Sequence, residues 1–426
     1  MVAVQATKNQ IIQGLEWLAI TASGGKMFHS CKHSHVATSL VVACAIAFSG
    51  VAVAQTWSSP QLVANGNGQA VSTNGSGTSA VIFTPVAGGL QASVQSGGVW
   101  GSPIALSAAT AAANIAVAPN GDVLAVWVFR TTNTYNPNTA QARFYSGGHW
   151  GNTITISANV FGNVSSSGLP SFGFDSHSQA TLIWEEITNP NPVTCSLRAE
   201  IGNAAGGFGS AQTISNASTC FGWTRLAVNS SGQVVAVEGA AGILSAVVIA
   251  ISRDASGAWG TPVTVGPTGV YRQRQPKVGL GNEGTAVLVF LINGGVWYSV
   301  RSGGTWSAPA DLIASGAAGV AGVAVDGSGN AVAAYGQTTI NPGTYTVYRP
   351  VGGTWQPKVQ INSSTQVVAT PAGSFVAGGT TVSTRLAGSS TWNQQTFSNS
   401  QLVNAAAGLA IAVGAPQVSV STAAVP

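Results

Sequence analysis

Residues 302–313 read SGGTWSAPADLI, and this glycine turn followed by an aromatic residue returns throughout the chain. The same phrase is recognisable as SGGVWGSPIALS from residue 96, SGGHWGNTITIS from 146 and VGGTWQPKVQIN from 351. Its aromatic residues are Trp57, Trp100, Trp150, Phe208, Trp259, Trp306, Trp355 and Trp392. Intervals of 37–58 residues between them indicate an internal repeat of one structural unit.

A second phrase lies between these turns, for example NIAVAPNGDVLAVW from residue 114 and VAVDGSGNAVAAY from residue 323. Each copy has two short apolar runs joined by a turn of Gly, Asn, Asp or Ser, which is the sequence pattern of a β-hairpin. A third run follows, such as TYTVYRP from residue 344, and the aromatic turn then leads into a fourth. Four strands in a unit of this length predict the blade of a β-propeller.

The two ends of the chain predict how the propeller is completed. We name the strands of a blade A to D from the centre outward, so that the hairpin phrase is A–B and the aromatic turn precedes D. Residues 56–63 (TWSSPQLV) have no A–B–C run before them, and residues 401–422 have no D strand after them. We therefore predict an all-β propeller of eight four-stranded blades, closed by the N-terminal strand joining the C-terminal blade. Seven blades are the alternative, if the short last units fuse.

The residue types of the aromatic turn have structural explanations. A glycine pair supplies the positive φ angles that a tight turn requires. The large apolar ring that follows is expected to wedge against the neighbouring blade. We therefore assign these eight aromatic residues to packing rather than to a ligand site.

One packing position breaks its own pattern. The residues six positions beyond the A–B turn are Phe83, Trp127, Trp184, Glu238, Phe290 and Tyr335. A carboxylate in such a position is costly unless it is paired. In one interpretation Glu238 lines a pocket, paired with Arg225 or with the arginines at 272 and 274. In the other, the position is exposed to solvent in that blade.

The B–C and D–A connections share one face of the predicted propeller, which we call the top face. The longest of them occur in the second to fifth blades, and loops held by a rigid scaffold are favourable places for binding residues. Aromatic rings there can stack on sugar rings, and Asn-rich loops can bond hydroxyl groups. The candidate binding residues are Arg130, Tyr135, Glu186, Trp223, Arg225, Glu238, Tyr271, Arg272 and Arg274.

Glu185 and Glu186 form an adjacent pair of carboxylates, the residue type that glycoside hydrolysis uses. Neighbouring residues on a strand point to opposite faces of the sheet, so these two cannot address one substrate together. We expect Glu186 to make a rim contact or a salt bridge with Arg130.

The charge content excludes nucleic acid as a partner. Only 6% of residues are charged and 45% are hydrophobic, which is the opposite of a disordered chain. The net charge is +4, but three lysines and Glu16 precede residue 55 and leave 12 basic and 10 acidic groups. No Lys/Arg run forms the basic face that nucleic-acid binding requires.

Residues 27–54 have the organisation of a secretory signal peptide. Lys32 lies in a short polar region, an uncharged apolar stretch starts at Val36, and an A-x-A cleavage site ends at Ala54. We predict that Met27 is the true start, that residues 1–26 are a mis-assigned extension, and that residues 55–426 form one secreted or periplasmic domain with no stable membrane span. An uncleaved anchor and a lipid anchor at Cys44 are the alternatives.

Cys195 and Cys220 are the cysteines that survive this cleavage. In an exported chain two cysteines favour a disulfide, because a zinc site would need further Cys or His residues at ligand spacing. We place Cys195 on the B–C side of the third blade and Cys220 on the D–A side of the fourth. The pair is therefore predicted to staple adjacent blades, and no metal site is predicted.

The alternation of GGTWSAP with VAVDGSGNAVAAY resembles secreted bacterial propellers of the sialidase-like and Asp-box repeat superfamily, over essentially the whole mature chain. The Asp-box pattern is S-x-D-x-G-x-T-W at the C–D turn, and residues 252–259 keep its aspartate as Asp254 with one extra residue. Sialidases of that superfamily use an arginine triad, a Tyr/Glu nucleophile pair and an acidic proton donor. No three arginines of this chain match that triad, so the resemblance assigns no catalytic residue.

These observations favour an exported, non-catalytic, monomeric propeller that needs no cofactor and recognises a glycan or a protein partner on its top face. Few titratable groups leave few means for acid–base catalysis. A sialidase-like glycoside hydrolase is the first alternative, implied by the resemblance. A structural or adhesive surface protein without a small ligand is the second.

Overall fold

The computed structural model describes part of the chain, and the parts it describes are residues 58–59, 61–109, 111–129, 137–162, 168–217, 220, 222–239, 247–267, 273–339, 342–361, 366–369, 375–378, 381–385, 391–396, 400–406, 409–414 and 417–424. The chain divides into Met1–Val53 and Ala54–Pro426, and all of these residues belong to the second part. The predicted extension, signal peptide and lipid-anchor cysteine lie outside the described residues.

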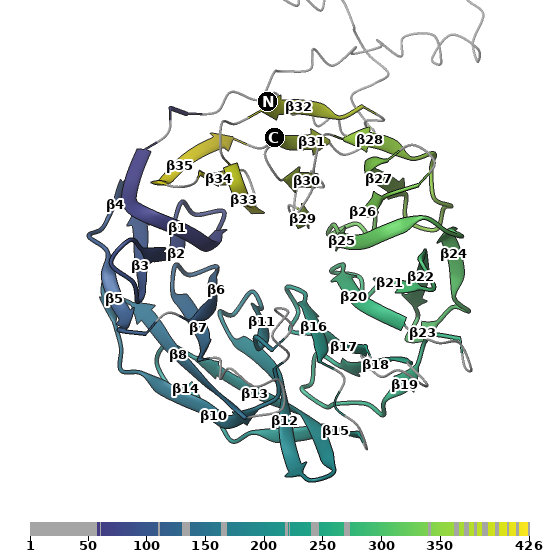
Figure 1. Cartoon of the computed structure of the whole chain (residues 1–426), viewed down its shortest axis with the longest axis horizontal. Coiled ribbons are helices and arrows are strands. Elements are labelled where there is room, and N and C mark those ends of the chain that lie inside the picture. The colour runs from purple at the N-terminus through teal and green to yellow at the C-terminus, as the bar shows by residue number, and fades with distance from the viewer. Residues whose placement is uncertain are drawn as a thin grey trace, which may run out of the picture. The chain divides into compact units, whose positions relative to one another are not determined.

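Every regular element of the described residues is a β-strand, and the strands follow one another as repeating antiparallel units (Figure 1). The first unit contains β1 (Gln61–Thr73), β2 (Ser79–Pro85), β3 (Leu90–Ser96), β4 (Val99–Trp100) and β5 (Ile104–Ser107). The second contains β6 (Ala112–Val117), β7 (Val123–Phe129), β8 (Asn138–Ser146), β9 (His149–Trp150) and β10 (Ile154–Val160). The third contains β11 (Ser171–Phe174), β12 (Ala180–Pro190), β13 (Val193–Asn203), β14 (Gly207–Phe208) and β15 (Gln212–Ala217).

The later units repeat the same order. The fourth contains β16 (Trp223–Val228), β17 (Val234–Gly239), β18 (Val248–Arg253) and β19 (Val263–Thr264). The fifth contains β20 (Gln273–Leu280), β21 (Ala286–Ile292), β22 (Gly295–Ser302), β23 (Thr305–Trp306) and β24 (Ala310–Ile313). The sixth contains β25 (Ala317–Val325), β26 (Ala331–Gln337), β27 (Gly343–Arg349) and β28 (Val359–Ile361). The last two contain β29 (Gln366–Ala369), β30 (Phe375–Gly378), β31 (Thr381–Arg385) and β32 (Asn393–Thr396), and then β33 (Ser400–Ala406), β34 (Leu409–Gly414) and β35 (Gln417–Ala424).

Strand β1 belongs to two units at once. Its first part pairs with β35, with Gln61 opposite Val420 and Asn65 opposite Gln417. Its second part, from Gly66, pairs with β2. A Cβ at Gly66 would collide with the carbonyl oxygen of Thr84, so glycine permits the close approach where β1 passes from one partner to the other. The predicted pairing of the N-terminal strand with the C-terminal strand is confirmed.

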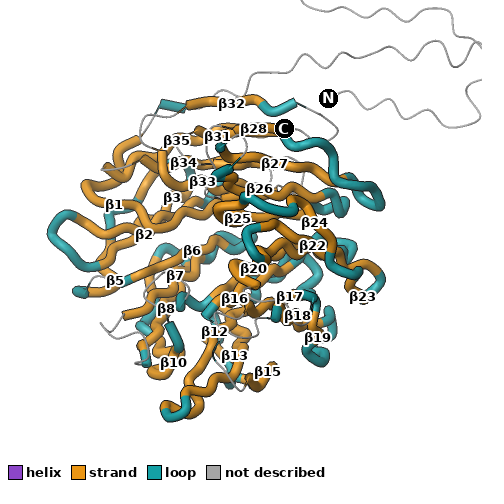
Figure 2. The backbone as a smooth tube through the Cα atoms, turned by 45° about the vertical axis from the view of Figure 1, so that its right-hand side comes forward, coloured by secondary structure: helices purple, strands orange, loops and turns teal. Residues whose placement is uncertain are grey.

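The inner strands of neighbouring units contact one another in chain order, from β1 through β6, β11, β16, β20, β25 and β29 to β33. Strand β33 in turn contacts β1. Figure 1 shows these strands around a common centre, and Figure 2 shows the strands joined by short loops and turns. The described residues therefore have an all-β, propeller-like arrangement.

The aromatic turns pack between units, as predicted. At the turns before Trp100, Trp150 and Trp306, both glycines have positive φ angles between 57° and 89°. Each aromatic residue packs against a hydrophobic cluster that its own unit shares with the preceding one, and this holds for Trp100, Trp150, Phe208, Trp259, Trp306, Trp355 and Trp392. Trp57 lies outside the described residues. Each copy of the repeated turn therefore supplies an aromatic side chain that packs between its own unit and the preceding one.

The A–B turns are tied to one another at the opposite end from the top face. In the fourth unit, Oδ1 of Asn229 accepts hydrogen bonds from the backbone N–H groups of Ser231 and Gln233, at 3.2 and 3.0 Å. Its Nδ2 donates to the carbonyl oxygen of Gly281 in the fifth unit, at 3.1 Å. Asn74 bonds the carbonyl oxygen of Ala118 in the next unit in the same way, at 2.8 Å. One buried side chain therefore closes its own turn and links two units.

Replacing this side chain tests the link. Asn229→Ala is expected to lower the free energy of unfolding by about 2 kcal/mol, because buried backbone groups in two units lose their partners. Urea unfolding followed by circular dichroism measures the change. Asn229→Asp keeps the Oδ1 acceptor and loses the donor to Gly281, and an aspartate occupies the equivalent turn position at 175 and 326. An Asp variant as unstable as the Ala variant would assign the whole effect to the inter-unit bond.

Candidate functional site

Charged and aromatic residues gather where the inner strands of the third to fifth units approach the top face. Arg225 on β16 and Lys277 on β20 each lie four residues before the first residue of their A–B turn. The equivalent residues in the first, second, third and sixth units are Ala70, Asn114, Ser171 and Gly322. Because neighbouring inner strands pack side by side, the repeat places this arginine and this lysine at the same depth in adjacent units. These two cations and Trp223 of β16, together with Glu185 of β12 and Glu238 of β17 on the adjoining second strands, are called here the inner-strand charge cluster.

The two cations of the cluster are held without a carboxylate partner in the described residues. Burial lowers the pKa of Arg225, whose guanidinium donates to the carbonyl oxygen of Thr224 at 2.6 Å. Burial, and then the like charge of Arg225, lowers the pKa of Lys277 to about 8. The ion pair found in the described part of the chain joins Arg198 and Glu186 of the third unit, and neither Arg225 nor Lys277 takes part in it. A ligand with acceptor oxygens would satisfy both cations.

Glu238 occupies the packing position that is aromatic in the first, second, third, fifth and sixth units. Its exposed fraction is 1%, as low as those of Trp184 and Tyr335, so the interpretation that it faces solvent is wrong. Neither carboxylate oxygen has a hydrogen-bond partner among the described residues, and the expected pairing with Arg225 is absent. Burial, and then the charge of Glu185, raises the pKa of Glu238 to about 8. The group is therefore largely protonated at neutral pH.

Glu185 and Glu186 point to opposite faces of β12, as predicted. Glu185 is buried, and its Oε2 accepts a hydrogen bond from the backbone N–H of Gly222 at 2.6 Å, toward the fourth unit. Glu186 accepts from the Ser157 hydroxyl at 2.7 Å, and its Oε2 lies 3.2 Å from Nε of Arg198. The ion pair of Glu186 is thus made with Arg198, whereas Arg130 lies outside the described residues. The two carboxylates serve different inter-unit interfaces.

The predicted disulfide between Cys195 and Cys220 is present. Each cysteine lies on the predicted side of its unit, and only the predicted staple between two blades needs correction. Cys195 lies within β13, opposite Ala217 of β15, and Cys220 lies in the connection from β15 to β16. The bond therefore ties the D–A connection to the third unit rather than joining two sheets. Gly222, the donor to Glu185, follows two residues later, so the disulfide fixes the segment that holds this carboxylate.

Of the nine predicted binding residues, Trp223 and Arg225 lie two residues apart on β16, Glu238 lies opposite Thr224 on the neighbouring β17, and Glu186 lies in the third unit. Arg274 pairs through its backbone with Leu291, and its side chain lies outside what is described. Arg130, Tyr135, Tyr271 and Arg272 lie outside the described residues altogether. Sequence reasoning missed Lys277, although its offset from the A–B turn, identical to that of Arg225, was the available signal.

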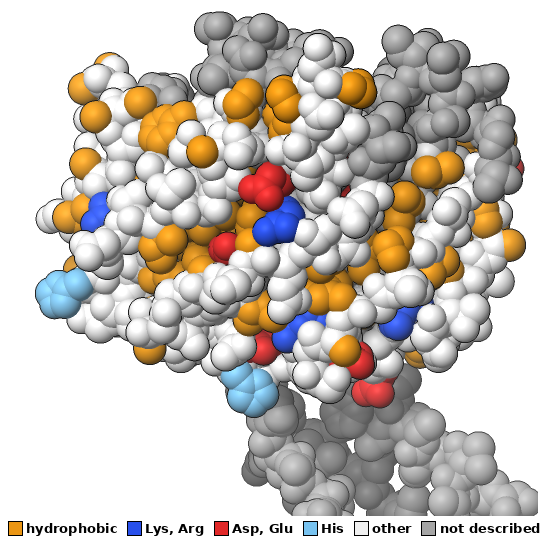
Figure 3. Space-filling model, turned by 90° about the horizontal axis from the view of Figure 1, so that it is seen from below, with side chains coloured by type: hydrophobic (Ala, Val, Ile, Leu, Met, Phe, Trp, Pro, Cys, Tyr) orange, Lys and Arg blue, Asp and Glu red, His pale blue; other side chains and the backbone are white. Residues whose placement is uncertain are grey.

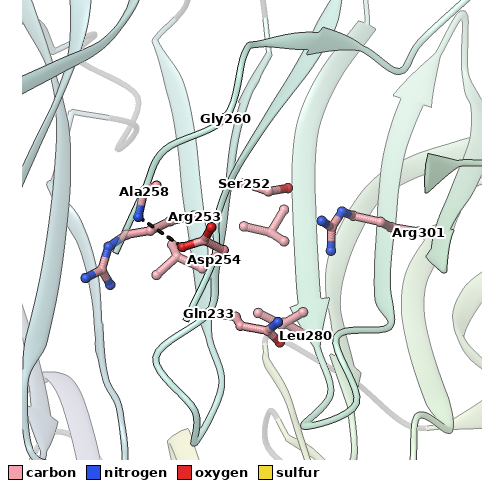
Figure 4. A pocket seen from close by; sticks show the side chains of 10 residues that line it. Gln233, Ser252, Arg253, Asp254, Ala258, Gly260, Leu280 and Arg301 are labelled. Carbon is pink, nitrogen blue, oxygen red and sulfur yellow. Dashed lines mark hydrogen bonds between the residues drawn. The ribbon is translucent and has the colours of Figure 1, made fainter. Parts of the chain in front are cut away.

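A pocket with a volume of about 210 Å³ lies between the fourth and fifth units and is lined by none of the cluster residues. Figure 4 shows Arg301 on one side and Arg253 and Asp254 on the other. Arg253 donates to the carbonyl oxygens of Gly257 and Gly232, at 3.3 and 3.1 Å. Asp254 accepts from the Ser256 hydroxyl at 2.6 Å and from the Ala258 N–H at 3.0 Å. The aspartate that resembles an Asp-box residue therefore closes its own turn.

The described surface is poor in charge. In the view of Figure 3, small groups of acidic and basic side chains are separated by uncharged surface. Among the residues that the structure describes, no group of three or more His, Cys, Asp or Glu side chains is placed to hold a metal ion. The same residues include no helix of the length and hydrophobicity that crossing a membrane would take.

Among known proteins, similarity to this chain was found only in solved structures. No protein-family model and no curated protein matches the chain. A polysaccharide lyase described as an ulvan lyase is 10% identical, with a TM-score of 0.44 over 86% of this chain and 95% of its own. Polysaccharide lyase Uly1 is 11% identical, with a TM-score of 0.44 over 71% and 87%. A variant of the NanB sialidase from Streptococcus pneumoniae is 12% identical, with a TM-score of 0.38 over 78% and 67%. At such identities and TM-scores these similarities assign neither a family nor an activity.

Proposed function

We propose that this protein is an exported, non-catalytic binding propeller of eight blades that recognises a glycan through the inner-strand charge cluster and the top-face connections around it. The pairing of β1 with β35 and the contact of β33 with β1 support closure by the two ends of the chain. The disulfide supports an oxidising compartment.

One observation carries the proposal. Arg225 and Lys277 are half-buried on neighbouring inner strands, Glu238 is buried on β17, and among the described residues no ion pair joins these three. Burying charges without such pairing destabilises a fold. Because the two cations lie at the same depth on adjacent inner strands and half-buried Trp223 begins β16, a polyhydroxylated ligand would offer oxygens to the cations and a sugar face to the ring.

A glycoside hydrolase is a second candidate, favoured by the protonation of Glu238. A carboxyl group that keeps its proton near neutral pH has the property of a general acid, and Glu185 is a second carboxylate close enough to influence its pKa. The 1% exposure of Glu238 argues for binding over catalysis, because a general acid must reach the bond that it protonates.

A glycan array probed with the protein tests binding. Trp223→Ala and Arg225→Gln are each expected to weaken binding of the captured glycan by about tenfold or more, which corresponds to loss of roughly 1.4 kcal/mol. Arg143→Gln, which removes an arginine bonded to the carbonyl oxygen of Gly151 in the second unit, is the matched control and should bind normally.

The same array separates the candidates. Capture without cleavage of the glycan supports the binding propeller. Release of product that disappears in Glu238→Gln would replace it with the hydrolase. Silence across neutral and acidic glycans would contradict both and favour a structural or adhesive role.

A further inference from the structure

A groove between the fifth and sixth units is unlike the other inter-unit interfaces. It has a volume of about 610 Å³ and is lined by Tyr298 and Asp311 from the fifth unit and by Tyr335, Trp355 and Lys358 from the sixth. Binding sites for small ligands fall in the range of roughly 300–1,000 Å³. None of the residues of the inner-strand charge cluster lines it. The groove is therefore a separate place on the molecule.

Its two charged residues break the repeat. Lys358 stands three residues after its aromatic turn residue, where the other copies have Pro60, Pro103, Thr153, Ala211, Pro262, Pro309 and Gln395. Asp311 stands five residues after Trp306, where the copies at Trp100, Trp150, Phe208, Trp259 and Trp355 have Ala105, Thr155, Thr213, Thr264 and Gln360. Blade packing is achieved in those copies without either charge. In a chain of which 6% is charged, two such departures meeting in one groove require an explanation other than the fold.

The groove also has an unusually large share of the chain's tyrosines. The chain has seven tyrosines, and two of them, Tyr298 and Tyr335, line the groove, while Tyr345 lies beneath Lys358. Tyr298 meets Trp355 edge to face with ring centroids 5.5 Å apart, and Tyr335 stacks on Tyr345 at 6.1 Å. The partly exposed rings of Tyr298 and Trp355 therefore form the apolar wall of the groove, and the buried rings of Tyr335 and Tyr345 support it from behind.

Lys358 is held in position over that wall. Its Nζ lies 4.3 Å from the centroid of the Tyr345 ring and donates to Oε1 of Gln337 at 2.9 Å. Asp311 is exposed on the facing unit and brings an acceptor to the opposite side of the groove. A fixed donor, an acceptor and aromatic faces across one groove are complementary to a ring that is apolar on its C–H faces and polar at its edges.

We propose that this groove is a second binding site that takes a single sugar ring. Its C–H face would lie against the aromatic wall, with hydroxyl groups donating to Asp311 and accepting from Lys358. A purely apolar ligand would displace water from Asp311 and Lys358 without offering either group a hydrogen bond, which opposes binding. The ligand class rests on the proposed function, but the site does not share residues with the inner-strand charge cluster.

The test uses the full chain on an array of neutral and acidic oligosaccharides, followed by titration of each captured glycan. Asp311→Asn and Lys358→Gln are expected to weaken at least one captured glycan by tenfold or more, and Trp223→Ala should leave that glycan bound. Glu283→Gln, at an exposed acidic residue of the A–B turn in the fifth unit, is the matched control and should bind as the unaltered protein does. Circular dichroism of each variant establishes that folding is retained.

The outcomes separate the two sites. Loss of every captured glycan in Trp223→Ala, with normal binding by the Asp311 and Lys358 variants, would overturn the groove and keep the proposed function. Loss in the Asp311 and Lys358 variants alone would support the groove and count against the inner-strand charge cluster. Capture of no glycan by the unaltered protein would overturn both proposals.

Discussion

The free energy of unfolding is expected to fall by roughly 4 kcal/mol as the pH rises from 4.5 to 8, and Glu238→Gln is expected to abolish most of this fall. The pKa of Glu238 is about 8 in the folded protein, against an ordinary value of 4.5. Between these values the folded protein keeps a proton that the unfolded chain has lost, so stability decreases with pH by at most about 1.4 kcal/mol per unit. The stabilisation that comes from the proton on Glu238 is complete below pH 4.5 and is lost above pH 8.

Urea unfolding of both proteins at several pH values measures this difference. Two other ionisable groups with shifted pKa values, Glu200 and Lys277, also make stability depend on pH and must be separated from Glu238. Glu200, whose pKa burial raises to about 7, is half-buried and adds a smaller fall that Glu200→Gln isolates. Lys277, with a pKa lowered to about 8, makes stability rise with pH from about 8 toward 10.5, which is the opposite sign. Parallel pH profiles for Glu238→Gln and the unaltered protein would show that Glu238 is not the buried acid described here.

The repeated units can be predicted from the sequence because each copy has the same kind of turn, the same large ring after it and the same apolar periodicity. A glycine pair with positive φ closes the turn before Trp306, and the same pair closes the turn before Trp150. Each large ring then needs a second surface to bury it, and the neighbouring unit is the surface available. The pairing of Gln61 with Val420 likewise follows from an incomplete unit at each end. Local turn chemistry and apolar periodicity thus predict most of the architecture.

The charged site was predicted less well, and the failure at Glu238 has a geometric cause. The hairpin register sets Thr224 opposite Glu238, and Arg225 opposite Val237. Residues one position apart on a strand face opposite sides of the sheet, so Arg225 and Glu238 serve different inter-unit interfaces. Counting the register outward from the turn at Asn229 would have excluded their pairing without any structure.

The charged side chains that do lie near Glu238 and Lys277 could not be predicted from the sequence. Glu238 is influenced by Glu185, which lies in the preceding unit, and Lys277 by Arg225, which lies in its preceding unit. Such pairs depend on how two sheets face each other. A sequence repeat gives the depth of each residue within its own unit, but the identity of the side chain across the interface depends on packing between units.

Reduction of the bond between Cys195 and Cys220 is expected to lower the free energy of unfolding by about 3–4 kcal/mol, the value that loop-closure entropy gives for a loop of this length. The two cysteines are 25 residues apart, and the closed loop includes the strand β15. Reduction also releases the segment from which Gly222 donates to Glu185. Urea unfolding with and without a reducing agent, at a pH where the protein is fully folded, measures the change.

Amide hydrogen exchange tells a local release from a purely global loss of stability. If the disulfide fixes the D–A connection, the Gly222 amide should exchange faster in the Cys195→Ala/Cys220→Ala protein, while amides of β26 keep their protection under the same folded conditions. Gly222→Ala in the oxidised protein is the matched probe, because it leaves the disulfide intact and disturbs the donor directly; burial of Gly222 makes this change costly. An unfolding curve that does not shift on reduction would mean that β13 and β15 already hold this connection by their pairing, as Ser196 does by donating to Asn216 at 2.9 Å.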